Sequence, residues 1–196
     1  MEVINQLEND IEAAKAEYAK AAAAEAAAQA SINAIIAQMQ AEEEAARQEA
    51  AENNQQYTGT GSTATGTYIW PLPGYSPGSA YGWRMHPIFN EMRFHAGEDI
   101  GAPSGTPILA ADSGVATVIP DNGNGYGNYI MINHGGGRVT LYAHMSSFAV
   151  SGGASVSQGQ VIGYVGSTGN STGPHLHFEV RVNGATTDPK QYFNFG

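Results

Sequence analysis

The chain has 196 residues, no cysteine and a formal net charge of −10. Without cysteine it can form neither a disulfide framework nor a thiolate metal site, so any metal must be bound by histidine and carboxylate ligands. The acidic balance argues against a nucleic-acid binder, and no apolar run approaches the roughly 20 residues of a transmembrane helix. The start of the chain shows no signal-peptide pattern; it opens directly in helix-forming sequence, as a fragment of a longer protein would.

Residues 1–56 differ in composition from the rest of the chain. They contain no glycine or proline, and 19 of them are alanine, whereas all 25 glycines and all 9 prolines come later. Such a segment has high helix propensity and no helix breaker, so we expect a helix over residues 1–52, roughly 80 Å long. It carries 11 acidic and 3 basic residues, which is typical of a solvated face.

Apolar residues recur along this helix at an average spacing of 3.5 residues. The pattern predicts a coiled-coil seam, with Glu25 as its one mismatch. An alanine-rich helix buries little by itself and needs a partner surface. Two interpretations stay open: a spacer or self-associating stalk that offers residues 1–52 to a coiled-coil partner, and a regulatory arm that docks on a partner or over the C-terminal domain. The seam residues are Ile4, Leu7, Ile11, Ala14, Tyr18, Ala21, Ala28, Ile32, Ile35 and Met39.

The remainder of the chain reads as a linker and a β domain. Residues 53–67 are polar and of low complexity, so we expect a flexible linker before a domain at 68–196. Short apolar runs separated by glycine predict a mostly antiparallel β domain, with a hairpin turn at 135–137. The fold class is therefore α+β, a long helix followed by a β-sheet domain. The predicted strands are residues 114–119, 129–133, 139–144, 161–165 and 175–182.

The last of these strands alternates strictly between polar and apolar side chains. As a strand it places His175, His177 and Glu179 on one face and apolar side chains on the face that packs against the core. Two imidazoles on a rigid strand suit metal binding or proton transfer, although His-x-His alone is weak evidence. Glu179 would either orient a ligand histidine from behind or point to solvent.

His95 and Asp99 form a second candidate pair. In an extended segment their Cα atoms would lie about 13 Å apart, too far to share one ion with bonds of about 2 Å. Gly97 lies between them and offers a point at which the backbone can bend or bulge. The pair therefore becomes a candidate for metal binding only if the chain turns at this glycine.

The other histidines are interpreted one by one. His144 ends a predicted strand, in which it would share a face with Tyr142, away from the core. His86 precedes a proline and His134 a glycine-rich turn, and both are interpreted as structural or exposed.

Taken together, these residues indicate a catalytic metal site. Two histidines and one carboxylate on a β scaffold leave an open coordination position, which distinguishes catalytic from structural zinc. Two further histidines nearby would serve proton transfer or oxyanion stabilisation. A non-haem iron oxygenase uses the same kinds of ligand but gives no reason for the two extra histidines. A purely structural coiled-coil protein would leave the whole set unexplained.

The chain from about Tyr68 to Phe195 resembles the LytM/lysostaphin-type zinc metallopeptidase domain of bacterial cell-wall hydrolases. Glu98 departs from the family pattern, which usually has an aliphatic residue there, and adds a negative charge beside the expected metal site. The helix resembles, much more weakly, the coiled coils that often precede such domains. The matching segments, in family order, are Gly82-Trp83-Arg84-Met85-His86-Pro87-Ile88, Phe94-His95-Ala96-Gly97-Glu98-Asp99-Ile100, Leu141-Tyr142-Ala143-His144 and Gly166-Ser167-Thr168-Gly169-Asn170-Ser171-Thr172-Gly173-Pro174-His175-Leu176-His177-Phe178-Glu179.

The resemblance implies a β-sheet metallopeptidase domain with an open groove. It implies that His95, Asp99 and His177 bind Zn²⁺, and that His144 and His175 are the catalytic pair. The implied activity is hydrolysis of peptide bonds in the stem peptides or cross-bridges of peptidoglycan, in the cell wall or the periplasm. Which of the pair is the general base stays open.

One alternative comes from the same family. Some domains of this type have lost their ligands and act as binding modules that activate a separate cell-wall amidase, often with a coiled coil ahead of them. The complete ligand set of this chain disfavours that interpretation.

Overall fold

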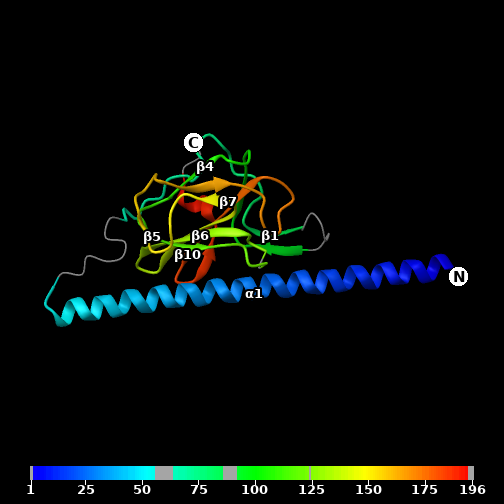
Figure 1. Cartoon of the computed structure of the whole chain (residues 1–196), viewed down its shortest axis with the longest axis horizontal. Coiled ribbons are helices and arrows are strands. Elements are labelled where there is room, and N and C mark those ends of the chain that lie inside the picture. The colour runs from blue at the N-terminus through cyan, green and yellow to red at the C-terminus, as the bar shows by residue number, and fades with distance from the viewer. Residues whose placement is uncertain (1, 56–63, 86–91, 124, 194–196) are drawn as a thin grey trace.

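The computed structural model describes residues 2–55, 64–85, 92–123 and 125–193. Within these residues a helix of 51 residues precedes a domain of short strands, so the expected α+β fold class is confirmed (Figure 1). Part of the predicted linker (56–63) and His86 lie outside the described residues. In chain order the elements are α1 (Glu2–Glu52), β1 (Gly82–Met85), β2 (Met92–His95), β3 (Glu98–Gly101), β4 (Pro107–Leu109), β5 (Gly114–Ile119), β6 (Asn128–Gly135), β7 (Arg138–Phe148), β8 (Ser155–Val156), β9 (Val161–Val165), β10 (His175–Val182), β11 (Ala185–Thr187) and the 3₁₀ turn η1 (Pro189–Tyr192).

Helix α1 runs without interruption because nothing in its sequence breaks it. It ends at Glu52, two residues before Asn54, which has a left-handed φ of 54°, a conformation that asparagine tolerates better than most residues. The amide of Gln55 then donates a hydrogen bond of 2.8 Å to the carbonyl of Ala50 and closes the last turn. Among the described residues, no helix combines the length and the hydropathy that crossing a membrane requires.

The domain is built on one antiparallel sheet of nine strands. Its main path runs β11-β10-β7-β6-β5-β8; β3 pairs with β10, and β9 pairs with β7 and β4. Strands β1 and β2 form a separate antiparallel pair. All five predicted strands are present, and the predicted hairpin joins β6 to β7. Gly136 and Gly137 both have positive φ there, as a tight two-residue hairpin turn requires.

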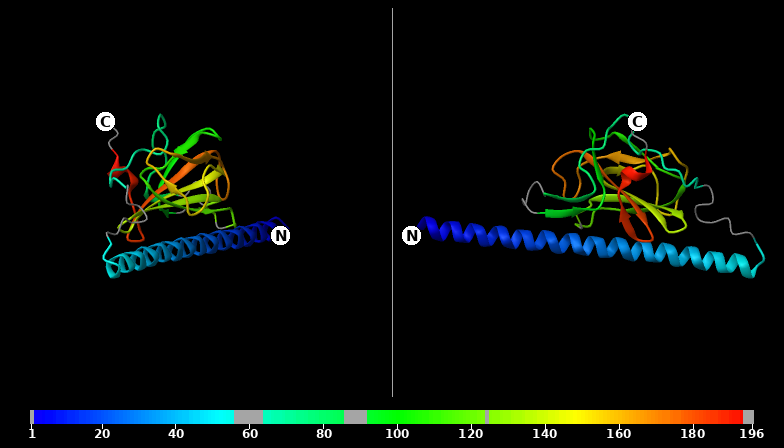
Figure 2. Two further views of the ribbon diagram at one scale, coloured as in Figure 1. Left: turned by 60° about the vertical axis from the view of Figure 1, so that its left-hand side comes forward. Right: turned by 180° about the vertical axis from the view of Figure 1, so that it is seen from behind.

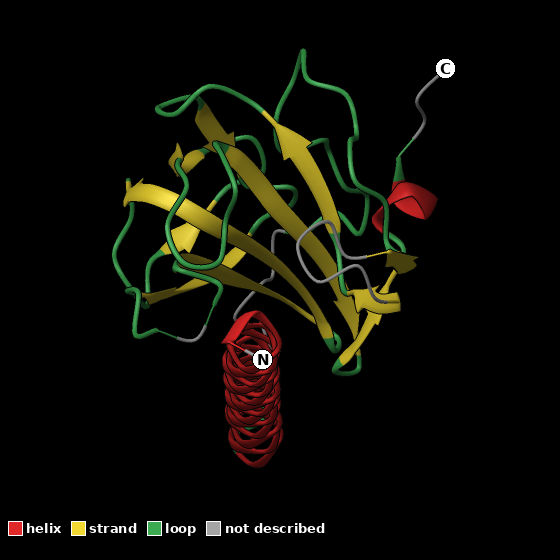
Figure 3. Cartoon of the chain, turned by 90° about the vertical axis from the view of Figure 1, so that its right-hand side faces the viewer, coloured by secondary structure: helices red, strands yellow, loops and turns green. Residues whose placement is uncertain are grey.

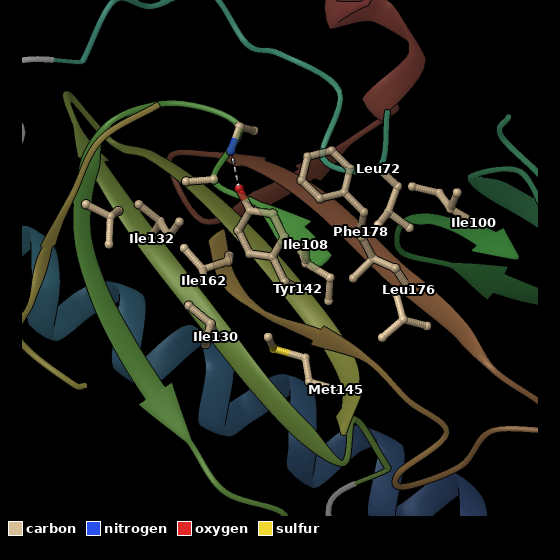
Figure 4. Packing of buried hydrophobic residues seen from close by; sticks show 14 of the residues in the cluster. Leu72, Ile100, Ile108, Ile130, Ile132, Tyr142, Met145, Ile162, Leu176 and Phe178 are labelled. Carbon is tan, nitrogen blue, oxygen red and sulfur yellow. Dashed lines mark hydrogen bonds between the residues drawn. The ribbon is translucent and has the colours of Figure 1, made fainter. Parts of the chain in front are cut away.

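One face of this sheet packs on the main hydrophobic core. Tyr142 and Phe178, on neighbouring strands, are fully buried in it with Ile130 and Leu176 (Figure 4). The hydroxyl of Tyr142 accepts a hydrogen bond of 2.8 Å from the amide of Ala111, drawn as a dashed line in Figure 4. The core is therefore anchored by a polar contact that fixes the loop after β4 against β7.

The opposite face of the sheet is covered by α1, which runs beneath it (Figures 2 and 3). Ile32, Ile36 and Met39 of the helix pack on a second apolar cluster of the sheet, so both faces of β6 and β7 are buried. The sheet residues in that cluster are Tyr129, Met131, Val139, Leu141 and Ala143. Part of the predicted coiled-coil seam thus contacts the chain's own β domain.

The N-terminal part of the seam does not share this contact. Ile4 and Leu7 are each 61% exposed, and Ile11 is 46% exposed. The helix therefore has two parts, a buried seat around residues 28–39 and an exposed apolar stripe near its start.

We expect Ile36→Ala to lower the free energy of unfolding by about 2–4 kcal/mol, because it leaves a cavity between α1 and the sheet. The matched control is Ile4→Ala, the same substitution at an exposed position of the same helix, which should change stability by less than about 0.5 kcal/mol. Urea unfolding of both variants measures the difference. Equal stabilities would show that α1 does not depend on this seat.

Candidate metal centre

The pairing of three strands brings the candidate residues together. Strand β10 lies between β3 and β7, and its register sets His177 opposite Asp99 on one side and opposite Ala143 on the other. Alternation along β10 places His175 on the same face as His177. His95 joins them from the end of β2. That face of the sheet is the one that α1 covers.

Three donor atoms meet at one point. His95 Nε2 lies 3.0 Å from Asp99 Oδ1 and 3.0 Å from His177 Nδ1, and the last two atoms are 2.9 Å apart. Ligands of a tetrahedral ion with bonds of about 2.0–2.1 Å lie roughly 3.3 Å from each other, so this triangle has nearly the size that one ion requires. Among the described residues these three form the group of side chains able to hold a metal ion.

The short distance between His95 and Asp99 depends on Gly97. Strand β2 ends at His95 and β3 begins at Glu98, so the chain turns between them, at the expected glycine. A Cβ atom on Gly97 would lie 2.4 Å from the carbonyl oxygen of Phe178 and 3.0 Å from Cε1 of His177. The glycine is therefore needed for close approach to β10.

Glu98, which was expected to add charge beside the site, is directed elsewhere. Its side chain is buried, and its carboxylate lies 3.4 Å from Lys190 Nζ of η1. Burial raises the pKa of Glu98, and Lys190 partly offsets this effect.

Each donor of the triangle is held by a further contact. The Nδ1 of His95 lies 2.9 Å from the carbonyl of Ala80, and Asp99 Oδ2 lies 3.4 Å from an Arg84 nitrogen. The Nε2 of His177 lies 3.0 Å from Oε1 of Glu179, which is fully buried. Of the two roles considered for Glu179, the structure has the carboxylate behind His177. Such contacts fix the ring and direct the other nitrogen, here Nδ1, toward the point where the three donor atoms meet.

Two carboxylates control the charge at this point. Burial alone would lower the pKa of His177, but hydrogen bonds with Asp99 and Glu179 raise it to about 9. Burial alone would raise the pKa of Asp99, but hydrogen bonds from His177 and His95 hold it well below its usual value. The site is therefore built to hold positive charge, whether a proton or a metal cation.

The side chain of His144 lies beside that of His175, a position that alternation along β7 does not predict. It was expected to share a face with Tyr142, and this expectation is wrong: Tyr142 packs in the main core, whereas the ring of His144 lies 4.6 Å from that of His175. The cause is a β-bulge, in which β7 has two residues where β6 has one, together with a left-handed φ of 61° at His144. The bulge turns the side chain onto the face of the metal centre.

The rings of His144 and His175 are oriented in the same way. The Nδ1 of His144 lies 2.8 Å from the carbonyl of Thr168, and the Nδ1 of His175 lies 2.8 Å from the carbonyl of Gly173. A carbonyl oxygen only accepts hydrogen bonds, so in each ring Nδ1 carries the hydrogen. The Nε2 of each ring is then available for a contact with another group. Burial, helped by the charge of His177, lowers the pKa of His144 to about 3. His144 is thus a neutral imidazole with a free acceptor atom.

A cleft of about 1190 Å³ contains all five side chains. One wall consists of residues on α1, mainly small ones such as Ala21, Ala22 and Ala26, with Glu17 and Glu25 among them. Small side chains leave the cleft open where the helix passes the site. The groove expected from the sequence is therefore bounded on one side by α1.

Several residues of the site have no clear signal in the sequence. Tyr126 donates a hydrogen bond of 2.8 Å to Glu179, and Arg181 is fully buried against the same carboxylate. Arg181 continues the alternation of β10, which was the one available hint; nothing in the sequence marks Tyr126. His134 is buried away from the cleft, between the Ser113 carbonyl and Thr140, as its structural interpretation required.

Comparisons with known proteins agree with this arrangement. A family model described as "Peptidase family M23" matches residues 93–189. The catalytic domain of the antimicrobial peptidase lysostaphin from Staphylococcus simulans superposes with a TM-score of 0.56 and is 36% identical over 62% of this chain and 93% of its own. The chain belongs to peptidase family M23.

Two curated relatives are similar to part of this chain. The DD-carboxypeptidase/endopeptidase Mpg of Neisseria meningitidis is 51% identical over 124 residues, which are 63% of this chain and 28% of that protein. The peptidoglycan DD-endopeptidase ShyC of Vibrio cholerae is 44% identical over 107 residues, 55% of this chain and 24% of that protein. The chain thus spans about a quarter of the length of these relatives.

We expect Gly97→Ala to destabilise the M23 domain by about 1–3 kcal/mol, because the added methyl group must displace β10 or the turn before β3. Gly101→Ala is the matched control in the neighbouring strand, since its Cβ would meet no atom within 4 Å. That control should stay within about 0.5 kcal/mol of the parent chain. Chemical denaturation of both variants gives the comparison, and equal losses would contradict the close approach at Gly97.

Proposed function

We propose that this chain is a zinc-dependent endopeptidase that hydrolyses peptide bonds in the stem peptides or cross-bridges of bacterial peptidoglycan. The observation that carries the proposal is the meeting of five side chains in one cleft: the triangle of His95, Asp99 and His177, with His144 and His175 beside it. In the same proposal residues 68–196 are the catalytic domain, 53–67 the linker and 1–52 the helical segment.

The donor set supports zinc as the metal. Two imidazole nitrogens and one carboxylate oxygen are ligands that Zn²⁺ prefers, and three protein ligands leave a position for substrate. When bound, Zn²⁺ would polarise the peptide carbonyl and lower the pKa of water toward about 7. Asp99 supplies the one negative charge among the three donors, and Glu179 orients the His177 ring from behind.

The two remaining histidines would move protons and hold charge. The Nε2 of His144 can accept a proton from the attacking water and pass it to the leaving amine. Thr168 keeps the other nitrogen protonated, so the acceptor atom does not change during the cycle. His175, oriented by Gly173, can donate from Nε2 to the oxyanion that develops on the substrate carbonyl.

The names of two relatives support the proposed substrate. The Vibrio relative is named a peptidoglycan endopeptidase, and the Neisseria relative a DD-carboxypeptidase/endopeptidase. We propose that this chain acts on the same class of peptide, in the cell wall or the periplasm. The exposed apolar stripe near the start of α1 leaves a surface on which a coiled-coil partner or a second copy could bind.

The alternative, a module that activates a separate amidase, is not favoured. Such a module needs neither the ion triangle nor two oriented histidines, and this chain retains both. Zinc content separates the two functions, because the activator would be purified without near-stoichiometric zinc.

Digestion of purified peptidoglycan tests the proposal. The whole chain should release fragments with new amino and carboxyl ends, which mass spectrometry identifies. A chelator should stop the release, and added zinc should restore it, because the metal is required for hydrolysis. Release that continues unchanged in chelator would overturn the zinc mechanism.

Two histidine variants separate metal binding from proton transfer. His177→Ala should lose zinc and activity together, because only two protein ligands remain. His144→Ala should keep its zinc while turnover falls by about 10²–10⁴-fold, the usual contribution of a general base. Zinc content is measured on the same samples as peptidoglycan cleavage. Wild-type cleavage by the His144 variant would show that its catalytic assignment is wrong.

A further inference from the structure

The polar side chains of β10 form a continuous line from the metal centre to helix α1. His177, Glu179 and Arg181 follow each other on the face that α1 covers. Glu179 lies between the other two, with Oε1 at 3.0 Å from His177 Nε2 and Oε2 at 2.5 Å from Arg181 Nε. Glu179 and Arg181 are both fully buried.

Helix α1 supplies acceptors for the far end of this line. The Nη2 of Arg181 donates to Gln29 Oε1 at 3.1 Å, and its Nη1 donates to Asn33 Oδ1 at 3.4 Å. Gln29 Nε2 donates to the same oxygen of Asn33 at 2.8 Å, so each amide orients the other. Two side chains of the helix therefore complete the hydrogen bonding of a buried guanidinium, together with the carbonyl of Gly184 at 3.5 Å.

These polar contacts are not needed to hold the helix in place. Ile32, Ile36 and Met39 already provide an apolar seat on the sheet. A buried ion pair gains little over apolar residues of the same volume, because both charges lose their hydration. An apolar side chain at position 181 would serve docking at least as well, so the guanidinium needs another explanation.

The contact of Arg181 with Glu179 provides this explanation. A buried carboxylate is held in one position only if its partners are held as well. Arg181 fixes one oxygen of Glu179, Tyr126 and His177 share the other, and the helix fixes Arg181. If α1 left the sheet, the two outer nitrogens of Arg181 would turn to water and this constraint would be lost.

A second contact links α1 to the strand of the other histidine donor. Glu25 of the helix pairs with Arg93 at 3.1 Å, and Arg93 lies over the ring of Tyr18 at 4.9 Å. Arg93 is in β2, two residues before His95. The helix thus contacts both strands that carry a histidine of the triangle.

We propose that Gln29 and Asn33 of α1 are positioning residues for the metal centre, acting through Arg181 and Glu179 on His177. Docking of the helix and binding of the metal are then linked, and each strengthens the other by the same factor. This inference rests on the proposed function, in that it takes His95, Asp99 and His177 as metal ligands.

The first test is zinc affinity of the whole chain carrying Gln29→Met and Asn33→Leu together. Both replacements are close in size and favour helix, but they remove the acceptors of Arg181. We expect the dissociation constant for zinc, measured by competition with a chromophoric chelator, to rise about three- to tenfold. This is less than the 10- to 100-fold loss typical of a residue that contacts a ligand directly.

Two further variants separate positioning from a general effect on the helix. Gln38→Met is the matched control, because Gln38 is an exposed residue of α1 that bonds only to Glu42 among the contacts described, and its zinc affinity should equal that of the parent. Asn33→Asp keeps an acceptor for both Arg181 and Gln29, so it should retain the parental affinity. A general loss of helix docking would not be rescued in this way.

The second test uses the reverse direction of the linkage. Zinc should slow amide hydrogen exchange in α1 between residues 29 and 39 of the parent chain, and should do so less in the double variant. Equal zinc affinity of all variants, or exchange in α1 that zinc does not change, would overturn the inference. If the parent binds no zinc, this inference and the proposed function both fail. If it binds zinc with the expected linkage but cleaves no peptidoglycan, only the proposed function fails.

Discussion

The position of His177 between two carboxylates is the constraint on which the rest of the site depends. Asp99 faces one ring nitrogen at the wall of the cleft, and Glu179, which is fully buried, faces the other. An imidazole held in this way has one defined direction, and its Nε2 hydrogen points at Glu179 when Nδ1 binds a metal. The strand pairing of β3, β10 and β7 provides the positions, and Gly97 allows the strands to approach closely enough.

The helix changes the environment of this site in two ways. Its apolar seat buries the face of the sheet that would otherwise expose Tyr129, Met131 and Leu141 to solvent. Further toward its start, alanines pass the cleft and leave space, while Glu25 reaches across to Arg93. The change from large to small apolar residues along one helix therefore divides it into a part that packs and a part that bounds the cleft.

Much of the fold was readable in the sequence because its signals are local. The uninterrupted helix follows from the absence of glycine and proline, and the five predicted strands follow from alternation and glycine turns. The grouping of His175 with His177 also follows from alternation. Gly97 indicated that the chain could turn and bring His95 and Asp99 together. The structural need for this glycine is its close packing against β10, which the local sequence does not show.

The residues that the sequence misplaces or does not reveal have positions and contacts that depend on distant parts of the chain. Alternation gave His144 the wrong face because a bulge in β7 is set by its pairing with β6. The sequence leaves the role of Glu179 open because nothing local marks its partner Tyr126, and alternation in β10 is the one hint of its partner Arg181. Gln29 and Arg181 are 152 residues apart in the sequence, and no periodicity relates the two.

The left-handed backbone at His144 has a consequence for when the site comes into existence. A residue with a side chain gains nothing locally from φ near 61°, which costs of order 1 kcal/mol or more and must be imposed by its surroundings. Here the carbonyl of Tyr126 binds its amide and the carbonyl of Thr168 binds its ring. Those two loops are brought to β7 by separate parts of the chain. A partly folded or nascent chain would therefore carry all the histidines in its sequence without His144 beside His175, so the cleft is assembled only when the fold is complete.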